Sequence, residues 1–184
     1  MSFSLCVFCG AAFGDKPQFA SATRLVGQEI ARRGWTLVYG GGRIGLMGVL
    51  ADAALEAGGR VVGVMPGFLY EREVAHTRLT TLEVVASFAE RKTRMGELAD
   101  AFLSLPGGIG TMDELFEAWS WTHARLQDKP SGLLNVAGYY DALKIFIEGA
   151  VTAGFITSGS RASLHVESEI ASLLDWLATP IARI

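Results

Sequence analysis

The sequence predicts a three-layer α/β fold, in which a central, mostly parallel sheet carries helices on both faces. Short apolar runs alternate along the chain with amphipathic stretches of helical length. Three of the apolar runs end in Gly and a fourth ends in the Pro of a Pro-Gly pair, and these residues turn a chain sharply out of a strand. Apolar strands that alternate with helices form parallel sheets buried on both faces, as in Rossmann-like folds.

The expected elements follow one another without a break. Six apolar runs are expected to be strands, at residues 5–10, 36–41, 60–66, 81–87, 101–107 and 132–136. The stretches between and after them are expected to be helices, at about 17–33, 44–58, 88–99, 111–127 and 139–153. A short strand near 163–167 and a helix over about 168–178 come last. With 184 residues and no linker or repeat, residues 1–184 are expected to form a single Rossmann-like domain.

The composition argues against several classes of protein. The net charge is −3 and no run of Lys or Arg is present, so no nucleic-acid partner is expected. The longest apolar runs are far shorter than the about 18 residues that a membrane span needs. The opening MSFSLCVFCG lacks the basic start of a signal peptide. We therefore expect a cytoplasmic protein with no membrane partner.

Cys6 and Cys9 form a C-x-x-C pattern, which is typical of redox or metal sites. Within a strand, however, positions three apart point to opposite faces, and no second cysteine pair is available to complete a zinc site. Both are interpreted as core residues. The three histidines, His76, His123 and His165, show no metal-ligand spacing, so no metal is expected.

Two glycine clusters each follow a predicted strand and open a predicted helix: GGGRIGLMG at 40–48 and PGGIGT at 106–111. Such loops turn backbone N–H groups toward an anion, which the helix N-terminus also favours. Thr111 is expected to be the N-cap of its helix. Neither loop carries the full dinucleotide pattern or the Lys-Ser/Thr of a P-loop. A mononucleotide or sugar phosphate is therefore expected, rather than NAD or hydrolysed ATP.

Charged residues accompany the second loop. Asp113 and Glu114 are about 100° apart on a helix, so only one of them can face a ligand on the loop, and periodicity alone leaves the function of Glu114 open. Arg91 and Lys92 follow the preceding strand at the same sheet edge, where they either neutralise a phosphate or form a solvated helix face. Glu73, in the segment after the third strand, is a further candidate or ordinary loop polarity.

The motifs together resemble the LOG family, the cytokinin riboside 5′-monophosphate phosphoribohydrolases, many of which were once labelled lysine decarboxylases. PGGIGTMDE at 106–114 contains the whole signature P-G-G-x-G-T-x-x-E, and RKTRM at 91–95 contains the upstream R-K-x-x-M. The separation of the Arg from the signature Glu, 114 − 91 = 23 residues, also matches. CVFCGA, YGGGRIGLMG and KPSGLLNVAGYYD extend the likeness over nearly the whole chain.

The resemblance implies a catalytic pair, Arg91 and Glu114. It further implies a set of substrate-binding positions: Glu73, Arg91, Lys92, Gly107, Gly108, Ile109, Gly110, Thr111, Glu114 and Ser120, with Gly41, Gly42 and Gly45 of the first loop. Phe88 and Ala89 replace a Met and a His that many members carry, and Ala11 replaces a common Ser. These replacements are expected on the pocket wall, where they bear on substrate preference rather than on reaction class.

The implied reaction is hydrolysis of the N-glycosidic bond of adenosine 5′-monophosphate, plain or N6-modified, to a free base and ribose 5-phosphate. Glu114 would stabilise an oxocarbenium-like transition state or activate water, and neither metal nor organic cofactor is expected. Lysine decarboxylation is disfavoured, because it generally needs a Schiff-base Lys and the chain has only four lysines. The alternative is a non-catalytic nucleotide or molybdenum-cofactor carrier, which need not keep Arg91 with Glu114.

The resemblance also implies a homodimer. The helical stretches 115–126 and 139–151 carry more apolar residues than one buried face needs. Trp119, Trp121 and Phe146 cannot all lie on the same face. Burial of two helix faces within one chain is the alternative explanation.

Overall fold

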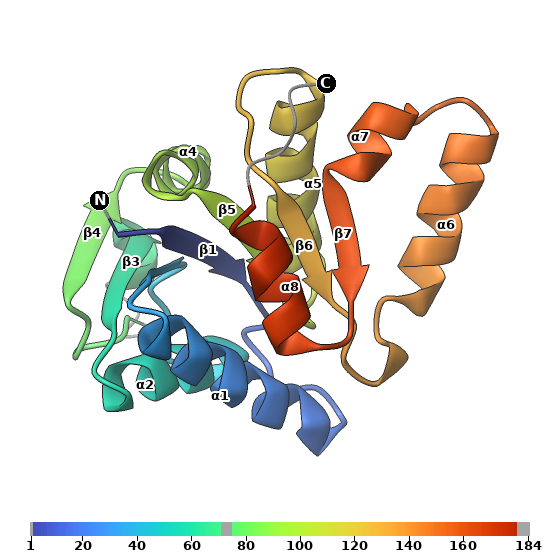
Figure 1. Ribbon diagram of the computed structural model, residues 1–184. Helices are drawn as coiled ribbons and strands as arrows, with labels where there is room; N and C mark the ends of the chain where they lie inside the picture. The colour runs from blue at the N-terminus through green and yellow to red at the C-terminus, as the bar shows by residue number, and fades with distance from the viewer. Residues whose placement is uncertain (1, 71–74, 180–184) are drawn as a thin grey trace.

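The central feature of the protein is a parallel sheet (Figure 1). The computed structural model describes residues 2–70 and 75–179. In this part of the chain seven strands pair in the order β4-β3-β2-β1-β5-β6-β7, and every pair is parallel. The strands are β1 Ser4–Phe8, β2 Thr36–Tyr39, β3 Arg60–Pro66, β4 Thr81–Val85, β5 Ala101–Ser104, β6 Ser131–Leu134 and β7 Leu164–Glu167. The predicted fold class is confirmed.

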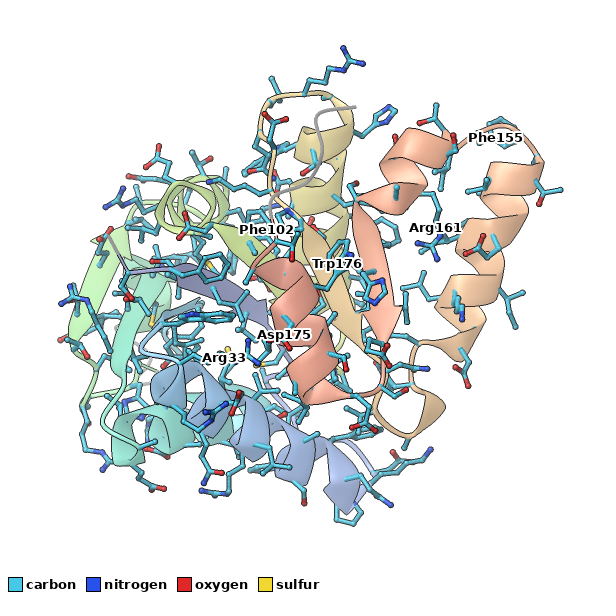
Figure 2. All side chains as sticks on the ribbon, viewed as in Figure 1. Arg33, Phe102, Phe155, Arg161, Asp175 and Trp176 are labelled. Carbon is cyan, nitrogen blue, oxygen red and sulfur yellow. The ribbon has the colours of Figure 1, made fainter. Side chains whose placement is uncertain are left out.

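Helices cover both faces of the sheet. The elements are α1 Pro17–Arg32, α2 Gly45–Glu56, α3 Gly67–Tyr70, α4 Phe88–Leu98, α5 Ile109–His123, the 3₁₀ turn η1 Val136–Gly138, α6 Asp141–Thr152, α7 Ser158–Ala162 and α8 Ile170–Leu177. Helices α1, α2 and α8 pack on one face, and α4 and α5 on the other (Figure 1). An ion pair of 2.7 Å between Arg33 and Asp175 joins the end of α1 to α8 (Figure 2).

Alternation along β1 divides the core into two layers. Leu5 and Val7 point to the cluster beneath α1, α2 and α8, whereas Cys6 and Phe8 point to the cluster beneath α4 and α5. Cys9 belongs to the first cluster, so the two cysteines lie on opposite faces of the sheet as predicted. Both are free, and burial raises the pKa of both thiols well above its usual range. They therefore act as core residues and not as a reactive pair.

The strand order reverses at β1. The chain builds β2, β3 and β4 outward on one side of β1, then crosses to β5, β6 and β7 on the other. Open α/β sheets bind ligands outside the carboxyl ends of the strands at such a switch point. In the register of the sheet Val7 of β1 pairs with Tyr39, and Phe8 pairs with Ser104. The loops after β1, β2 and β5 therefore leave the sheet at one place.

The structure corrects one detail of the prediction. Helix α5 begins at Ile109 with Gly108 as its N-cap, so Thr111 is its third residue and not the cap. Thr111 is buried beside Gly107, where a Cβ would lie 2.1 Å from the Thr111 hydroxyl oxygen. The short elements α3, η1 and α7 were not predicted, because each is too short to show a hydrophobic period.

Candidate active site

A pocket of about 740 Å³ opens at the switch point of the sheet. It lies between the loops that follow β1, β2 and β5, together with residues from α4, α5 and the segment before α6. Its lining consists of residues 9–14, Phe19, Gly40, Gly42, Ile44, Leu46, Met47, Met65, Leu69, Arg91, residues 106–111, Glu114 and Tyr139. The pocket thus brings together both predicted glycine loops, and Arg91 reaches it from α4.

The loop between β5 and α5 is held firmly by its neighbours. The Leu105 amide donates to Phe8 O at 2.9 Å, and the Gly10 amide donates to Pro106 O at 3.1 Å. The Tyr140 hydroxyl donates to Leu105 O at 2.7 Å, and the Tyr139 hydroxyl donates to Gly107 O. Three successive carbonyl groups of the loop thus have donors from other segments. The first N–H groups of α5 have no acceptor within the helix and are available to an anion.

The glycines of this loop have different surroundings. A Cβ on Gly107 would lie 2.8 Å from the Gly10 amide nitrogen as well as against Thr111, so close packing within the protein requires glycine there. A Cβ on Gly108 or on Gly110 would meet no protein atom within 4 Å. The backbone at these two residues is therefore open on the side of the pocket, as an anion site requires.

The two carboxylates that follow the loop have separate partners. Glu114 lines the pocket, and its side chain is only 11% exposed. Asp113 is 58% exposed, and its carboxylate accepts a hydrogen bond from the Lys92 ammonium at 3.0 Å. The expectation that only one of the pair faces the pocket is met, and the residue is Glu114.

Helix α4 brings Arg91 to Glu114. The helix starts at the N-cap Ser87, whose hydroxyl accepts from the Glu90 amide at 3.1 Å, and the Glu90 carboxylate accepts from the amide of Ala86, the residue before the cap, at 2.8 Å. This start places Arg91 in the first turn. Its Nε donates to Val64 O at 3.1 Å, and its Nη2 lies 3.5 Å from Oε1 of Glu114.

The Arg91–Glu114 pair is largely hidden from solvent, and this changes its electrostatics. Burial raises the pKa of the Glu114 carboxyl to about 7, and Asp113 and Glu117 add to the rise. Arg91 and Lys92 act in the opposite direction and favour the carboxylate. The group is thus poised to hold or release a proton near neutral pH, which is typical of functional carboxyl groups.

Other expected site residues lie outside the pocket lining. The Lys92 ammonium forms ion pairs with Asp113 and Glu117. Ser120 is exposed, and its hydroxyl donates to Glu117 O at 2.8 Å. Glu73 lies outside the described residues. Lys92 therefore lies outside the pocket lining and is paired with two carboxylates of α5.

The first glycine loop mainly serves packing. Gly42 lines the pocket, but Gly41 and Gly45 do not. Gly41 and Gly45 adopt left-handed backbone conformations, with φ of 77° and 58°. A Cβ on Gly45 would lie 2.3 Å from the carbonyl carbon of Ala11. The Leu46 amide donates to Gly10 O at 3.0 Å, so the start of α2 is partly satisfied by the protein itself.

Comparison with known proteins identifies the family. The family model described as "Possible lysine decarboxylase" matches residues 47–177. The cytokinin riboside 5′-monophosphate phosphoribohydrolase of Rhodococcoides fascians is 46% identical over 178 residues, which cover 96% of this chain and 90% of that protein. The Arabidopsis thaliana phosphoribohydrolase LOG1 is 44% identical over 157 residues, which cover 85% and 74%. The chain belongs to the LOG family.

Solved structures outside the LOG family share its fold. The molybdenum cofactor binding protein of Rippkaea orientalis superposes with a TM-score of 0.72 at 20% identity, over 96% of this chain and 95% of that one. The molybdenum cofactor carrier protein of Chlamydomonas reinhardtii gives a TM-score of 0.71 at 22% identity, over 96% of each chain. At this identity the likeness extends to the fold alone.

Positions where the chain departs from the LOG pattern divide between pocket and surroundings. Ala11 lines the pocket, as expected. Phe88 and Ala89 are exposed and lie outside the lining. The Phe88 ring lies 5.9 Å from Cζ of Arg91 and packs edge-on against Phe68 at 5.3 Å. Phe88 thus flanks the arginine rather than the cavity.

Several residues of the pocket lining were not among the expected substrate-binding positions, and Gly40 and Tyr139 are two of them. Tyr139 lies in the GYYD segment that carries part of the family likeness, and this was the available signal. Gly40 gave no separate signal within a run of three glycines.

The described residues offer neither a membrane span nor a cluster of metal ligands. No described helix has the length and apolar character to cross a membrane. Within residues 2–70 and 75–179 no three His, Cys, Asp or Glu side chains are grouped as a metal ion would require.

Proposed function

We propose that the protein hydrolyses the N-glycosidic bond of adenosine 5′-monophosphate, plain or N6-modified, to the free base and ribose 5-phosphate. The observation that carries the proposal is the buried Arg91–Glu114 pair in the same pocket as the open N-terminus of α5. The names of the similar proteins support it, since each is a cytokinin riboside 5′-monophosphate phosphoribohydrolase.

In this proposal the two halves of the signature bind different parts of the nucleotide. The 5′-phosphate binds the amides of residues 107–111, where the helix dipole favours a negative charge. Glu114 lies one helical turn further and faces the ribose. Asp113 is turned away and neutralised by Lys92, so it does not repel the phosphate. An anion-binding loop and two acids can thus share one short segment.

The carboxylate of Glu114 acts on the sugar. Cleavage of the bond between C1′ and the base develops positive charge on C1′ and the ring oxygen. A fixed, buried carboxylate stabilises that charge more than reorganising water would. In its ionised form Glu114 is also able to orient the attacking water or accept its proton, while the leaving base takes up a proton.

Arg91 supports the ionised form of Glu114 and positions the nucleotide. Its guanidinium lies 3.5 Å from Glu114 and lowers the pKa of that carboxyl against the effect of burial. Its planar fork of donors suits an anionic ligand better than the single ammonium of a lysine would. The proposed reaction needs neither a metal nor an organic cofactor.

The lysines argue against the decarboxylase in the family's description. A pyridoxal phosphate decarboxylase holds its cofactor on a lysine. None of the four lysines of the chain lines the pocket, Lys92 is paired with two carboxylates, and the Lys129 ammonium donates to Gly96 O at 2.7 Å. Decarboxylation through such a lysine therefore has no support in this site.

Incubation of the protein with adenosine 5′-monophosphate tests the proposal. Chromatography of the products is expected to detect adenine and ribose 5-phosphate in equal amounts. Adenosine is the matched control, since it lacks only the phosphate that the α5 loop binds. Nucleotide bound without turnover would favour a carrier, and equal kcat/KM for the nucleotide and adenosine would contradict the assignment of the loop.

We further propose that the protein is a homodimer. Helix α6 lies beyond the edge strand β7 (Figure 1), and Ile147 is its buried residue. Ile145 and Phe146 of α6 are exposed, as is Phe155 between α6 and α7 (Figure 2). By contrast, Trp119 is buried and donates to Ser160 O at 2.8 Å, and Trp121 packs on Gly96. The exposed apolar residues of α6 and the turn after it form the face proposed for the second copy.

The proposed setting is a single domain over residues 1–184 that works in the cytoplasm. Cys6 and Cys9 are both free thiols, as is usual in a reducing compartment. No nucleic-acid or membrane partner is proposed.

A further inference from the structure

The guanidinium of Arg91 occupies the space beside Gly40 in which a side chain at position 40 would lie. A Cβ built on Gly40 would lie 1.7 Å from Nη2 of Arg91 and 2.9 Å from its Cζ. No side chain tolerates such a contact, so any other residue at position 40 would exclude the guanidinium from its present site. Gly40 directly follows β2, and the Arg91 side chain enters from α4 to reach this point.

The conformation of Gly40 does not by itself require glycine. Its neighbour Gly41 and the later Gly45 have φ values of 77° and 58°, which other residues rarely adopt. The φ of Gly40 lies outside this left-handed region, so alanine would fit its backbone. The remaining reason for glycine at position 40 is the space that Arg91 occupies.

The space beside Gly40, called the Gly40 slot below, determines which contacts Arg91 makes. Its Nε donates to Val64 O at the end of β3, and its Nη2 faces Glu114 from the space above Gly40. A methyl group at position 40 would force the guanidinium out, and one or both of these contacts would break. Arg91 has other rotamers available, because only the end of its flexible side chain meets the new methyl group.

We propose that Gly40 is the positioning residue for Arg91, and that the first glycine loop holds the arginine against Glu114. Gly40 itself need not touch the substrate for this role. The inference deepens the proposed function and rests on it for its kinetic readout. It also gives the glycine loop after β2 a purpose different from that of a second phosphate loop.

The test is a double-mutant cycle with Gly40→Ala and Arg91→Ala. Gly40→Ala is expected to lower kcat/KM by about 10²-fold, the effect of misplacing a positioned group by about 1 Å. In the Arg91→Ala background the same change is expected to cost less than about threefold, because the guanidinium is already absent. Equal losses in the two backgrounds would overturn the inference.

A second readout does not depend on turnover. Titration of the Glu114 carboxyl, followed by ¹³C NMR of glutamate-labelled protein, is expected to give a higher pKa in Gly40→Ala, by about one unit or more, because the neighbouring cation has moved. Arg91→Ala should give a similar rise, and the double variant no further one. An unchanged pKa in Gly40→Ala would overturn the inference, even if the wild-type protein failed to hydrolyse the nucleotide.

Thermal unfolding covers the case in which Gly40→Ala folds poorly. The Arg91→Ala change removes the clash, so the double variant is expected to melt at the temperature of Arg91→Ala alone. If Gly40→Ala lowers the melting temperature equally with and without Arg91, the proposed role of the Gly40 slot would be contradicted.

Gly67→Ala is the matched control for the kinetic test. Gly67 follows β3 as Gly40 follows β2, and a Cβ on Gly67 would meet its nearest atom at an ordinary 3.6 Å. Its kcat/KM is expected to stay within about twofold of wild type.

Discussion

Nη2 of Arg91 and Oε1 of Glu114 lie 3.5 Å apart in the lining of the pocket, although the two residues are 23 positions apart in the chain (114 − 91). Their side chains are only 13% and 11% exposed. Helix α4 supplies the cation, and α5 supplies the carboxylate one turn after its first residues. The arrangement places a titratable acid one helical turn from the proposed phosphate site, which is the relationship that the proposed reaction needs.

Arg91→Ala is expected to impair both binding and turnover. The change removes a cation from the pocket, so the KM for the nucleotide should rise. It also leaves Glu114 buried without its nearest positive partner, so the carboxyl should be protonated more often and kcat should fall. Steady-state kinetics with adenosine 5′-monophosphate measure both effects. A variant with reduced kcat and normal KM would show that Arg91 does not contribute to nucleotide binding.

The rate should depend on pH through Glu114. Burial raises the pKa of this carboxyl to about 7, so it is largely protonated at pH 6 and largely ionised at pH 8. Since the ionised form is the proposed active form, kcat/KM is expected to rise about tenfold per pH unit below the pKa and to level off above it. A profile that falls as the pH passes from 6 to 8 would mean that Glu114 acts as a general acid instead.

The Tyr139 hydroxyl offers a test of the anion-binding loop. It donates to Gly107 O, while the ring packs edge-on against Phe19 at 5.5 Å. Tyr139→Phe keeps the ring and removes the hydrogen bond, so the loop should be less well ordered around the phosphate. We expect KM to rise by roughly two- to tenfold, the range of one hydrogen bond, with a smaller change in kcat. An unchanged KM would show that the loop holds its shape without this contact.

The exposed face of α6 leads to a prediction about assembly. Phe146→Glu places a charge on the proposed contact surface and is expected to give a monomer in sedimentation experiments at micromolar concentration. Leu25→Glu is the control, since Leu25 is an exposed apolar residue of α1, far from α6 in the sequence. A wild-type protein that sediments as a monomer, or a Phe146→Glu variant that remains dimeric, would count against this surface.

The sheet and most helices could be predicted because their signals are local. Each apolar run from 5–10 to 132–136 overlaps an observed strand, and the bounds differ by no more than three residues. The separation of Asp113 from Glu114 also followed from helix geometry alone. The start of α5 was misplaced, because threonine is a common N-cap residue, whereas Gly108 is the cap and the helix begins at Ile109.

Side-chain partners across the sheet could not be predicted in the same way. Lys92 was expected at the phosphate because it is a cation beside Arg91, yet successive residues of α4 point in different directions, and Lys92 meets Asp113 and Glu117 instead. The role of Gly40 depends on an arginine 51 residues away (91 − 40). Such contacts follow from the order of the strands, which no local pattern encodes.

The central claim is that Glu114, and not its neighbour, carries the chemistry. The measurement that tests it most directly is kcat for adenosine 5′-monophosphate in Glu114→Gln and in Asp113→Asn. Loss of one preorganised charge predicts a fall of roughly 10²–10³-fold for Glu114→Gln, with nucleotide binding retained because the amides of α5 are unchanged. Asp113→Asn should lose about tenfold at most, since its carboxylate points to Lys92. An inactive Asp113→Asn beside an active Glu114→Gln would contradict the account.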